Sequence, residues 1–268
     1  MSRDPRRWLV VGSAVVMLIG TLYGFGLLGT PVESSIGGSL AANATLLAPA
    51  TPAFSIWSLI YLGLFSFTIW QVLPFSRHSA RTDAVAALAA LSMVLNGAWL
   101  MVVQAGWIWA SVVIIFALVF TLGIIARLLA SKPAASRAEA VLLDGTFGLY
   151  LGWTSVATLA NVTAALVASG LPAVGSNAEP WAPAVLALGA VLGILLARTM
   201  GGRLTIAAAM AWGLGWIAVG RFTGEPASAL TGAAAAVAAA IVIAAAVLVR
   251  LRTARVPSRQ PLAAAGRA

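Results

Sequence analysis

The chain has 268 residues, of which 61% are hydrophobic and 9% are charged, and its formal net charge is +9. A water-soluble domain carries about 25% charged residues, so this composition excludes a soluble globular protein, whose surface needs more polar cover. The positive charge does not indicate a nucleic-acid-binding protein either, because the basic residues flank apolar runs and form no stripe on a polar face. The absence of cysteine excludes disulfides and thiolate metal sites.

Eight apolar runs follow one another along the chain. A helix needs about 20 apolar residues to cross a hydrocarbon core roughly 30 Å thick, and every backbone amide in that core must be bonded internally. The sequence therefore predicts an all-α fold, a polytopic transmembrane bundle of about eight spans. The predicted spans are residues 8–29, 53–73, 84–104, 107–129, 140–167, 181–197, 204–219 and 229–249.

Short connections link most of these spans, so consecutive helices are expected to be antiparallel neighbours. The sixth and seventh spans are the shortest and are joined by a tight turn at residues 199–202. Two interpretations stay open for this pair: two full crossings, or one hairpin that does not fully cross the membrane.

The basic residues define an orientation. With the N-terminus inside, fifteen of the sixteen Lys and Arg residues lie on the inner side, and only Arg221 lies outside. Because loops rich in Lys and Arg stay in the cytoplasm, we expect both termini to be cytoplasmic. The bias toward Ala, Gly and Arg, with Lys132 as the single lysine, indicates a GC-rich bacterial genome and hence the bacterial inner membrane.

The chain divides into three predicted parts. The first apolar run is too long for a signal-peptide core, so it is expected to be a retained anchor that belongs to the fold. The parts are a five-helix bundle at residues 1–170, three additional transmembrane helices at residues 171–251, and a disordered basic tail at residues 252–268.

The longest connection, residues 30–52, follows the first span on the outer side. It carries one charge, Glu33, together with the apolar residues Leu46 and Leu47. A loop of this length in a compact fold usually has a function or is disordered. Its apolar residues favour a loop that folds back over the helix ends.

Aromatic and polar side chains recur at helical spacing in the second, third and fifth spans. Within each span they share one helix face, and the topology places them in the outer half of the membrane or near its middle. Rings with a polar edge suit a pocket for a flat, largely apolar ligand. Alternatively, Trp and Tyr anchor helices at the membrane interface and Asn joins helices; spacing alone favours this second interpretation. The residues are Phe54, Trp57, Tyr61, Asn96, Trp99, Tyr150, Trp153, Ala157 and Asn161.

Three motifs built from these residues resemble those of the tryptophan-rich sensory protein family, also called the translocator protein or peripheral benzodiazepine receptor family. The resemblance covers residues 8–169. The chain departs from the family in two ways: the lead-in to the second span lacks a tryptophan, and about three helices follow the usual five. The motifs are Pro52, Phe54, Trp57 and Tyr61; Leu95, Asn96 and Trp99; and Tyr150, Trp153, Ala157 and Asn161.

The resemblance implies a five-helix bundle with a pocket that opens toward the long loop, in which Pro49 and Pro52 would belong to a lid. Family members bind porphyrins and other tetrapyrroles, and some bind sterols. We therefore expect a membrane receptor or carrier that needs no cofactor but holds a porphyrin- or haem-type ligand. The expected partners are the lipid bilayer, this ligand and a second copy in a homodimer. A secondary transporter for a small solute is the alternative, and no catalytic constellation indicates an enzyme.

One acid, Asp144, lies near the inner end of the fifth predicted span. Ionisable groups inside a membrane are functional candidates, but pairing with Arg127 or Arg137 close to the interface is the favoured interpretation. A proton relay would need a second buried ionisable group, which the sequence does not reveal. The single histidine, His78, is predicted to be solvated and to form no metal site.

Overall fold

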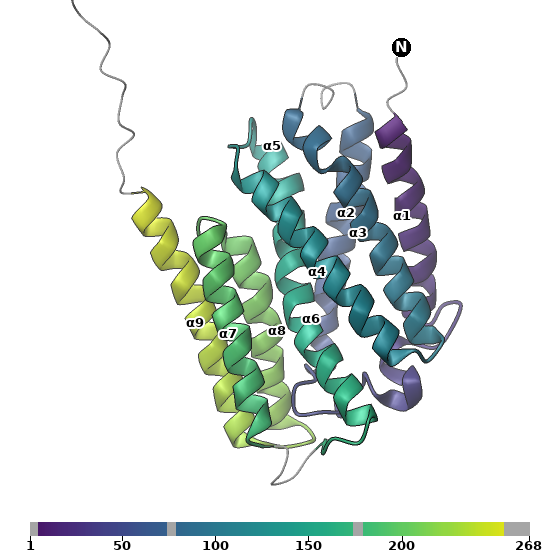
Figure 1. Ribbon diagram of the computed structural model, residues 1–268, viewed down its shortest axis with the longest axis vertical. Coiled ribbons are helices and arrows are strands. Elements are labelled where there is room, and N and C mark those ends of the chain that lie inside the picture. The colour runs from purple at the N-terminus through teal and green to yellow at the C-terminus, as the bar shows by residue number, and fades with distance from the viewer. Residues whose placement is uncertain (1–4, 74–78, 174–178, 255–268) are drawn as a thin grey trace, which may run out of the picture.

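The computed structural model describes residues 5–73, 79–173 and 179–254. Within these residues all regular secondary structure is helical (Figure 1). Eight helices in this part of the chain are long and apolar enough to cross a membrane. Large apolar side chains point outward, as Phe120 and Val113 do with 72% and 69% of their surface exposed. Such exposed apolar side chains suit a surround of lipid. The prediction of an all-α bundle with eight spans is confirmed.

The helices agree closely with the predicted spans. The first helix ends earlier than predicted, and the fifth span begins earlier, with a short irregular stretch. The elements are α1 Pro5–Gly24, η1 Val32–Ser34, η2 Ile36–Gly38, η3 Thr51–Ser55, α2 Ile56–Val72, α3 Ala80–Gln104, α4 Ile108–Ala130, α5 Arg137–Glu139, the π-helical η5 Ala140–Gly145, α6 Thr146–Ala168, α7 Trp181–Thr199, α8 Leu204–Thr223 and α9 Ala229–Ala254.

The sixth and seventh predicted spans correspond to α7 and α8. They have 19 and 20 residues, which is long enough for each to cross a hydrocarbon core. This length favours two full crossings over a hairpin that stops short.

Helix packing does not follow chain order everywhere. The closest partners are α1 with α3, α3 with α4, α4 with α6, α6 with α8, and α9 with both α7 and α8. Figure 1 shows α7, α8 and α9 beside the first six helices, with α6 next to them. The expectation that helices joined by short connections are the main neighbours is therefore wrong for α2 with α3, for α6 with α7 and for α7 with α8. A short connection restrains only the helix ends, whereas side-chain shape selects the packed face.

Glycines on α6 bring it close to α8. A Cβ atom placed on Gly152 would lie 2.2 Å from the carbonyl oxygen of Ile206, and one placed on Gly148 would lie 2.1 Å from Oγ1 of Thr205. Small residues allow two helix backbones to approach in this way inside a membrane. The seam between α6 and α8 thus joins the last three helices to the rest of the bundle.

Buried charges lie at one end of this seam. Asp144, in the π-helical turn, accepts from Arg81 at 2.7 Å and from Arg203 at the start of α8. Arg81 also lies 3.7 Å from Glu139, and these two residues are 5% and 2% exposed. The predicted partners of Asp144, Arg127 and Arg137, are therefore wrong. Arg81 and Arg203 reach it from the starts of α3 and α8, far from Asp144 along the chain, so sequence proximity does not reveal the pairing.

A second prediction that is wrong at this end of the bundle concerns buried ionisable groups. Glu139 is a buried ionisable group beside Asp144, although the sequence pointed to none. The sequence placed it just before the predicted fifth span, whereas the membrane helix extends back to Arg137.

Both described ends of the chain lie at the same end of the bundle (Figure 1). Residues 252–254 continue helix α9, so the predicted disordered tail is wrong for these three positions. The rest of that tail and His78 lie outside the described residues.

Candidate functional site

The connection between α1 and α2, residues 25–55 and here called the lid loop, folds back across the end of the bundle. It contains the short helices η1, η2 and η3. Leu46 and Leu47 are only 4% and 2% exposed, so the apolar residues of the loop are buried against the helices. The predicted fold-back of this loop is present in the structure.

Aromatic side chains from α2 and α6 meet beneath the lid loop. Trp57 stacks on Tyr61, with ring centroids 5.1 Å apart, and contacts Tyr150 and Trp153 edge-on at 5.9 and 6.2 Å. Phe54 contacts Trp153 edge-on at 5.8 Å. The sequence predicted only that these rings lie at a similar depth in the membrane. The packing of α2 against α6 brings them into one cluster.

The two asparagines join helices around this cluster. Asn96 Oδ1 accepts a hydrogen bond from the Tyr61 hydroxyl at 3.1 Å. Asn161 Oδ1 accepts from Trp99 Nε1 at 2.9 Å, and Asn161 Nδ2 donates to Ser111 on α4 at 2.9 Å. Amides in a membrane need partners of this kind. Both asparagines therefore have the joining role that spacing alone favoured, with Ser111 as a partner that the sequence gave no reason to select.

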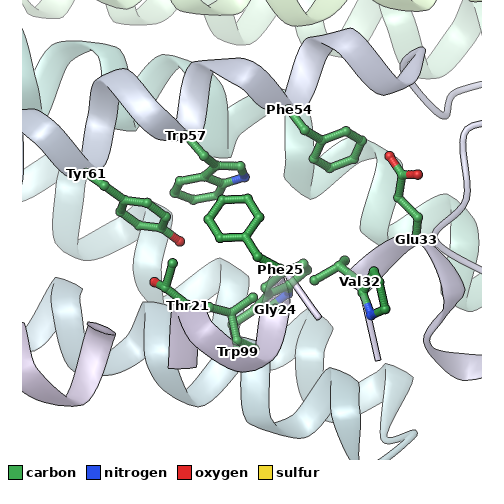
Figure 2. A pocket seen from close by; sticks show the side chains of 11 residues that line it. Thr21, Gly24, Phe25, Val32, Glu33, Phe54, Trp57, Tyr61 and Trp99 are labelled. Carbon is green, nitrogen blue, oxygen red and sulfur yellow. The ribbon is translucent and has the colours of Figure 1, made fainter. Parts of the chain in front are cut away.

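A cavity of about 150 Å³ lies between α1, α2, α3 and the lid loop (Figure 2). Of the predicted residues, Phe54, Trp57, Tyr61 and Trp99 line it. Figure 2 shows Phe25 beside Trp57, so five aromatic side chains surround this space. No pattern in the sequence predicted that the other lining residues would lie in a pocket. They are Thr21, Gly24, Phe25, Pro31, Val32, Glu33 and Leu100.

A smaller cavity of about 50 Å³ lies on the other side of Phe54, Trp99 and Val32, which line both spaces. Two buried polar atoms on its lining, Trp153 Nε1 and Thr45 Oγ1, have no hydrogen-bond partner among the described residues. The other predicted residues that line it are Pro49, Ala157 and Asn161.

Three predicted residues line neither cavity. Tyr150 and Asn96 support the cluster from behind, where the Tyr150 hydroxyl donates to the carbonyl of Ser92 at 3.3 Å. Pro52 is the second residue of η3 and borders an open groove beside Arg221 instead. Of the two lid prolines, only Pro49 therefore lies on the pocket side.

A third cavity, of about 300 Å³, lies between the lid loop, the end of α6 and the start of α7. Its lining is almost wholly aliphatic, and Thr163 donates its hydroxyl hydrogen to its own helix at Leu159. Trp181 and Leu171 on its rim are 71% and 51% exposed. Among the described residues of this lining, only Thr163 and Trp181 carry polar side-chain atoms, so the space offers a ligand mainly aliphatic contact.

The described residues that line the two aromatic cavities form no catalytic or metal-binding arrangement. Glu33 is the one charged residue among the described residues that line them. Groups of three or more His, Cys, Asp or Glu side chains that could hold a metal do not occur in the described part of the chain. Stacking, apolar contact and a few hydrogen bonds are therefore what this site offers a ligand.

Comparison with known proteins identifies the family of the chain. A family model described as TSPO-like protein matches residues 7–249. The chain belongs to the TSPO-like protein family. The match extends beyond residues 8–169, which carry the aromatic motifs, and includes α7, α8 and most of α9. A search of curated proteins and a search of solved structures found no match.

Membership of the TSPO-like family and the eight apolar helices make this an integral membrane protein of the receptor or transporter kind. Within that kind, the aromatic cluster under the lid loop is the part of the molecule best suited to hold a ligand.

Proposed function

We propose that this protein is a membrane receptor or carrier that binds a flat, largely apolar ligand of the tetrapyrrole type beneath the lid loop. The observation that carries the proposal is the cavity enclosed by five aromatic side chains, directly under a folded loop (Figure 2). Ring faces stack on a flat conjugated ligand, and the apolar surroundings remove its surface from water.

Two polar atoms in the smaller cavity would orient such a ligand. Trp153 Nε1 and Thr45 Oγ1 are buried without partners among the described residues. An unpaired buried donor costs about 1–3 kcal/mol, which a ligand recovers when it supplies an acceptor. The indole N–H of Trp153 therefore favours a ligand with an oxygen or nitrogen acceptor at one edge.

The lid loop has to move for a macrocycle to enter. The two aromatic cavities, about 150 and 50 Å³, are smaller than the roughly 300–1,000 Å³ of ordinary small-molecule sites. Phe54, Val32 and Trp99 separate the two spaces, and displacement of this wall together with the loop would merge them. We therefore expect the site to widen when its ligand enters.

Glu33 narrows the class of ligand. It is the one charged group on the described lining of the two cavities, and it is acidic. A carboxylate near the ligand edge repels free acid groups at low dielectric constant. We therefore expect a porphyrin ester or another neutral tetrapyrrole to bind more tightly than the matching free acid.

Fluorescence quenching of the purified protein tests this proposal. Protoporphyrin IX, its dimethyl ester and a sterol are titrated against the wild type and a Trp57→Phe/Trp153→Phe variant. A Trp8→Phe/Trp107→Phe variant is the matched control, because both of its tryptophans are more than 60% exposed. Saturable quenching that is lost only in the first variant supports the site. Its absence in folded wild-type protein refutes tetrapyrrole binding.

A secondary transporter is the second candidate function, and the buried ionic cluster favours it. Asp144 lies on an irregular π-helical turn that directly follows Glu139, and Arg81 and Arg203 reach this pair from other helices. Transporters use interrupted helices and buried charges to couple ions to solutes. Solute uptake into proteoliposomes, driven by a proton gradient and abolished by Asp144→Asn, would support this function. Uptake that does not depend on the gradient would exclude the coupling.

We also propose that both termini face the cytoplasm of a bacterium. Arg221 is the only basic residue at the lid-loop end among the described residues, and the others lie toward the opposite end. The positive-inside tendency then places the lid loop on the outer side. Reporter fusions at each terminus test this orientation, and periplasmic activity at either end would contradict it.

A further inference from the structure

Arg221, near the outer end of α8, is almost completely buried yet binds no carboxylate within salt-bridge distance in the described structure. It is 2% exposed. Its guanidinium donates to the carbonyl oxygens of Thr45 at 2.9 Å and Ala42 at 3.0 Å, both in the lid loop, and to that of Glu225 at 3.2 Å. A buried cation in this position therefore serves to hold backbone carbonyls.

Two more contacts join α8 to the same half of the lid loop. Trp212 Nε1 donates to the carbonyl of Ala53 at 2.9 Å. The backbone N–H of Ala50 donates to the carbonyl of Trp216 at 3.2 Å. Trp212 and Trp216 lie four residues apart and share one helix face. Arg221 lies five residues beyond Trp216, in the last turn of the helix, and reaches the loop from a different face. Contacts from α8 thus hold the loop over more than two helical turns.

The first half of the lid loop is attached to a different helix. Gln104, at the end of α3, binds both the N–H and the carbonyl of Thr30 through its side-chain amide, and it also donates to Ser35. The bonds to Thr30 are exposed, whereas the Arg221 bond to Thr45 is buried. Water competes for the exposed bonds, so the two attachments differ in strength.

We propose that α8 is the anchor of the lid loop, and that Arg221 is the positioning residue that sets how often the lid opens for ligand. The anchored half supplies Thr45 and Phe54 to the lining of the smaller cavity. Arg221 binds the carbonyl of Thr45 itself, so its contact lies one residue from the ligand space. This inference rests on the proposed function and gives the helices after α6 a role in it.

The chemistry of the contact explains why one side chain matters. Hydrogen bonds from a charged donor are stronger than neutral ones, and the planar guanidinium holds several carbonyls in a fixed geometry. Without it, buried carbonyls of the closed lid lose their partners, whereas in an open lid they would meet water. Loss of Arg221 therefore destabilises the closed state more than the open state.

The first arm of the test measures the lid without any ligand. Because the chain has no cysteine, Asn43→Cys gives a single attachment point for a spin label on an exposed lid position. The label is compared in this background alone, with Arg221→Met, and with Arg198→Met, which removes an exposed arginine at the end of α7. We expect greater label mobility with Arg221→Met and no change with Arg198→Met.

The second arm measures ligand exchange by stopped-flow quenching with protoporphyrin IX dimethyl ester. Arg221→Met is expected to speed dissociation by about ten- to a hundredfold, and to speed association as well, since a lid that opens more often affects both directions. Arg221→Lys should recover part of this change. A merely global loss of stability would not accelerate association.

The outcomes separate the two proposals. Greater label mobility with no ligand binding in the wild type supports the anchor and refutes the proposed function. Unchanged mobility and unchanged rates in folded Arg221→Met protein overturn the anchor and leave the pocket standing. Where Arg221→Met does not fold, Trp212→Phe decides: it removes only the bond to Ala53 and must show a smaller change in the same direction, or the anchor is refuted.

Discussion

The first six helices and the last three are built from different residues. Buried positions of α6 include Tyr150, Trp153, Thr158 and Asn161, whereas those of α9 are small or aliphatic: Thr231, Gly232, Ala235, Ala238, Val242 and Ala246. Rings with a polar edge can stack on a flat ligand and orient it. Small residues instead let helices pack closely. From this contrast we expect ligand chemistry in the first region and structural support from the second.

The largest expected effect comes from breaking the junction of the two regions. Gly152→Leu would push a side chain into the backbone of α8, because even a Cβ atom lies 2.2 Å from the Ile206 carbonyl oxygen. Overpacking of this kind should lower the free energy of unfolding by about 3 kcal/mol. Denaturant titration in detergent measures it. Gly123→Leu, on α4 with nothing within 4 Å, is the control and should stay close to wild type.

The next largest effect is expected from the charged residues at one end of the junction between α6 and α8. Asp144→Asn removes the negative partner of Arg81 and Arg203, and should lower the free energy of unfolding by about 2 kcal/mol because two partly buried cations lose compensation. The same unfolding titration applies. Asp83→Asn serves as the control because Asp83 is exposed. Equal losses in both variants would mean that the cluster does not join the regions.

A third change tests the ligand chemistry of the first region alone. Trp153→Phe keeps an aromatic ring in the cluster but removes the unpaired indole N–H. Binding of protoporphyrin IX dimethyl ester should weaken about tenfold, the value of one buried hydrogen bond, while folding is preserved. Isothermal titration measures the affinity. Unchanged affinity in folded protein would remove Trp153 from the site.

The smallest expected effect concerns charge at the lid. Glu33→Gln removes the acidic group on the cavity lining, and should tighten binding of protoporphyrin IX about threefold while leaving its dimethyl ester unchanged. Because the group is partly exposed, the effect should shrink at high salt. Competition titrations at two ionic strengths provide the readout, and an equal change for both ligands would argue against an electrostatic cause.

Sequence alone predicted the spans well because a bilayer requires long apolar segments with satisfied backbones. It also selected Trp57 and Trp153, whose spacing fixes their helix face and depth. In the sequence, Arg221 stood out only as the one basic residue predicted on the outer side, against the positive-inside tendency. Nothing in the sequence linked it to Thr45. Phe25 and the partners of Asp144 were missed for the same reason: their contacts join segments whose distance along the chain hides their packing.

The central claim is that a flat ligand lies within the aromatic cluster, and oxidation under light tests it most directly. A bound porphyrin generates short-lived oxidants when illuminated, and the ten tryptophans of the chain report where these act. Mass spectrometry should find Trp57, Trp99 and Trp153 oxidised before Trp8 and Trp181, although the last two are 63% and 71% exposed. Oxidation of the exposed tryptophans first would contradict a ligand beneath the lid loop.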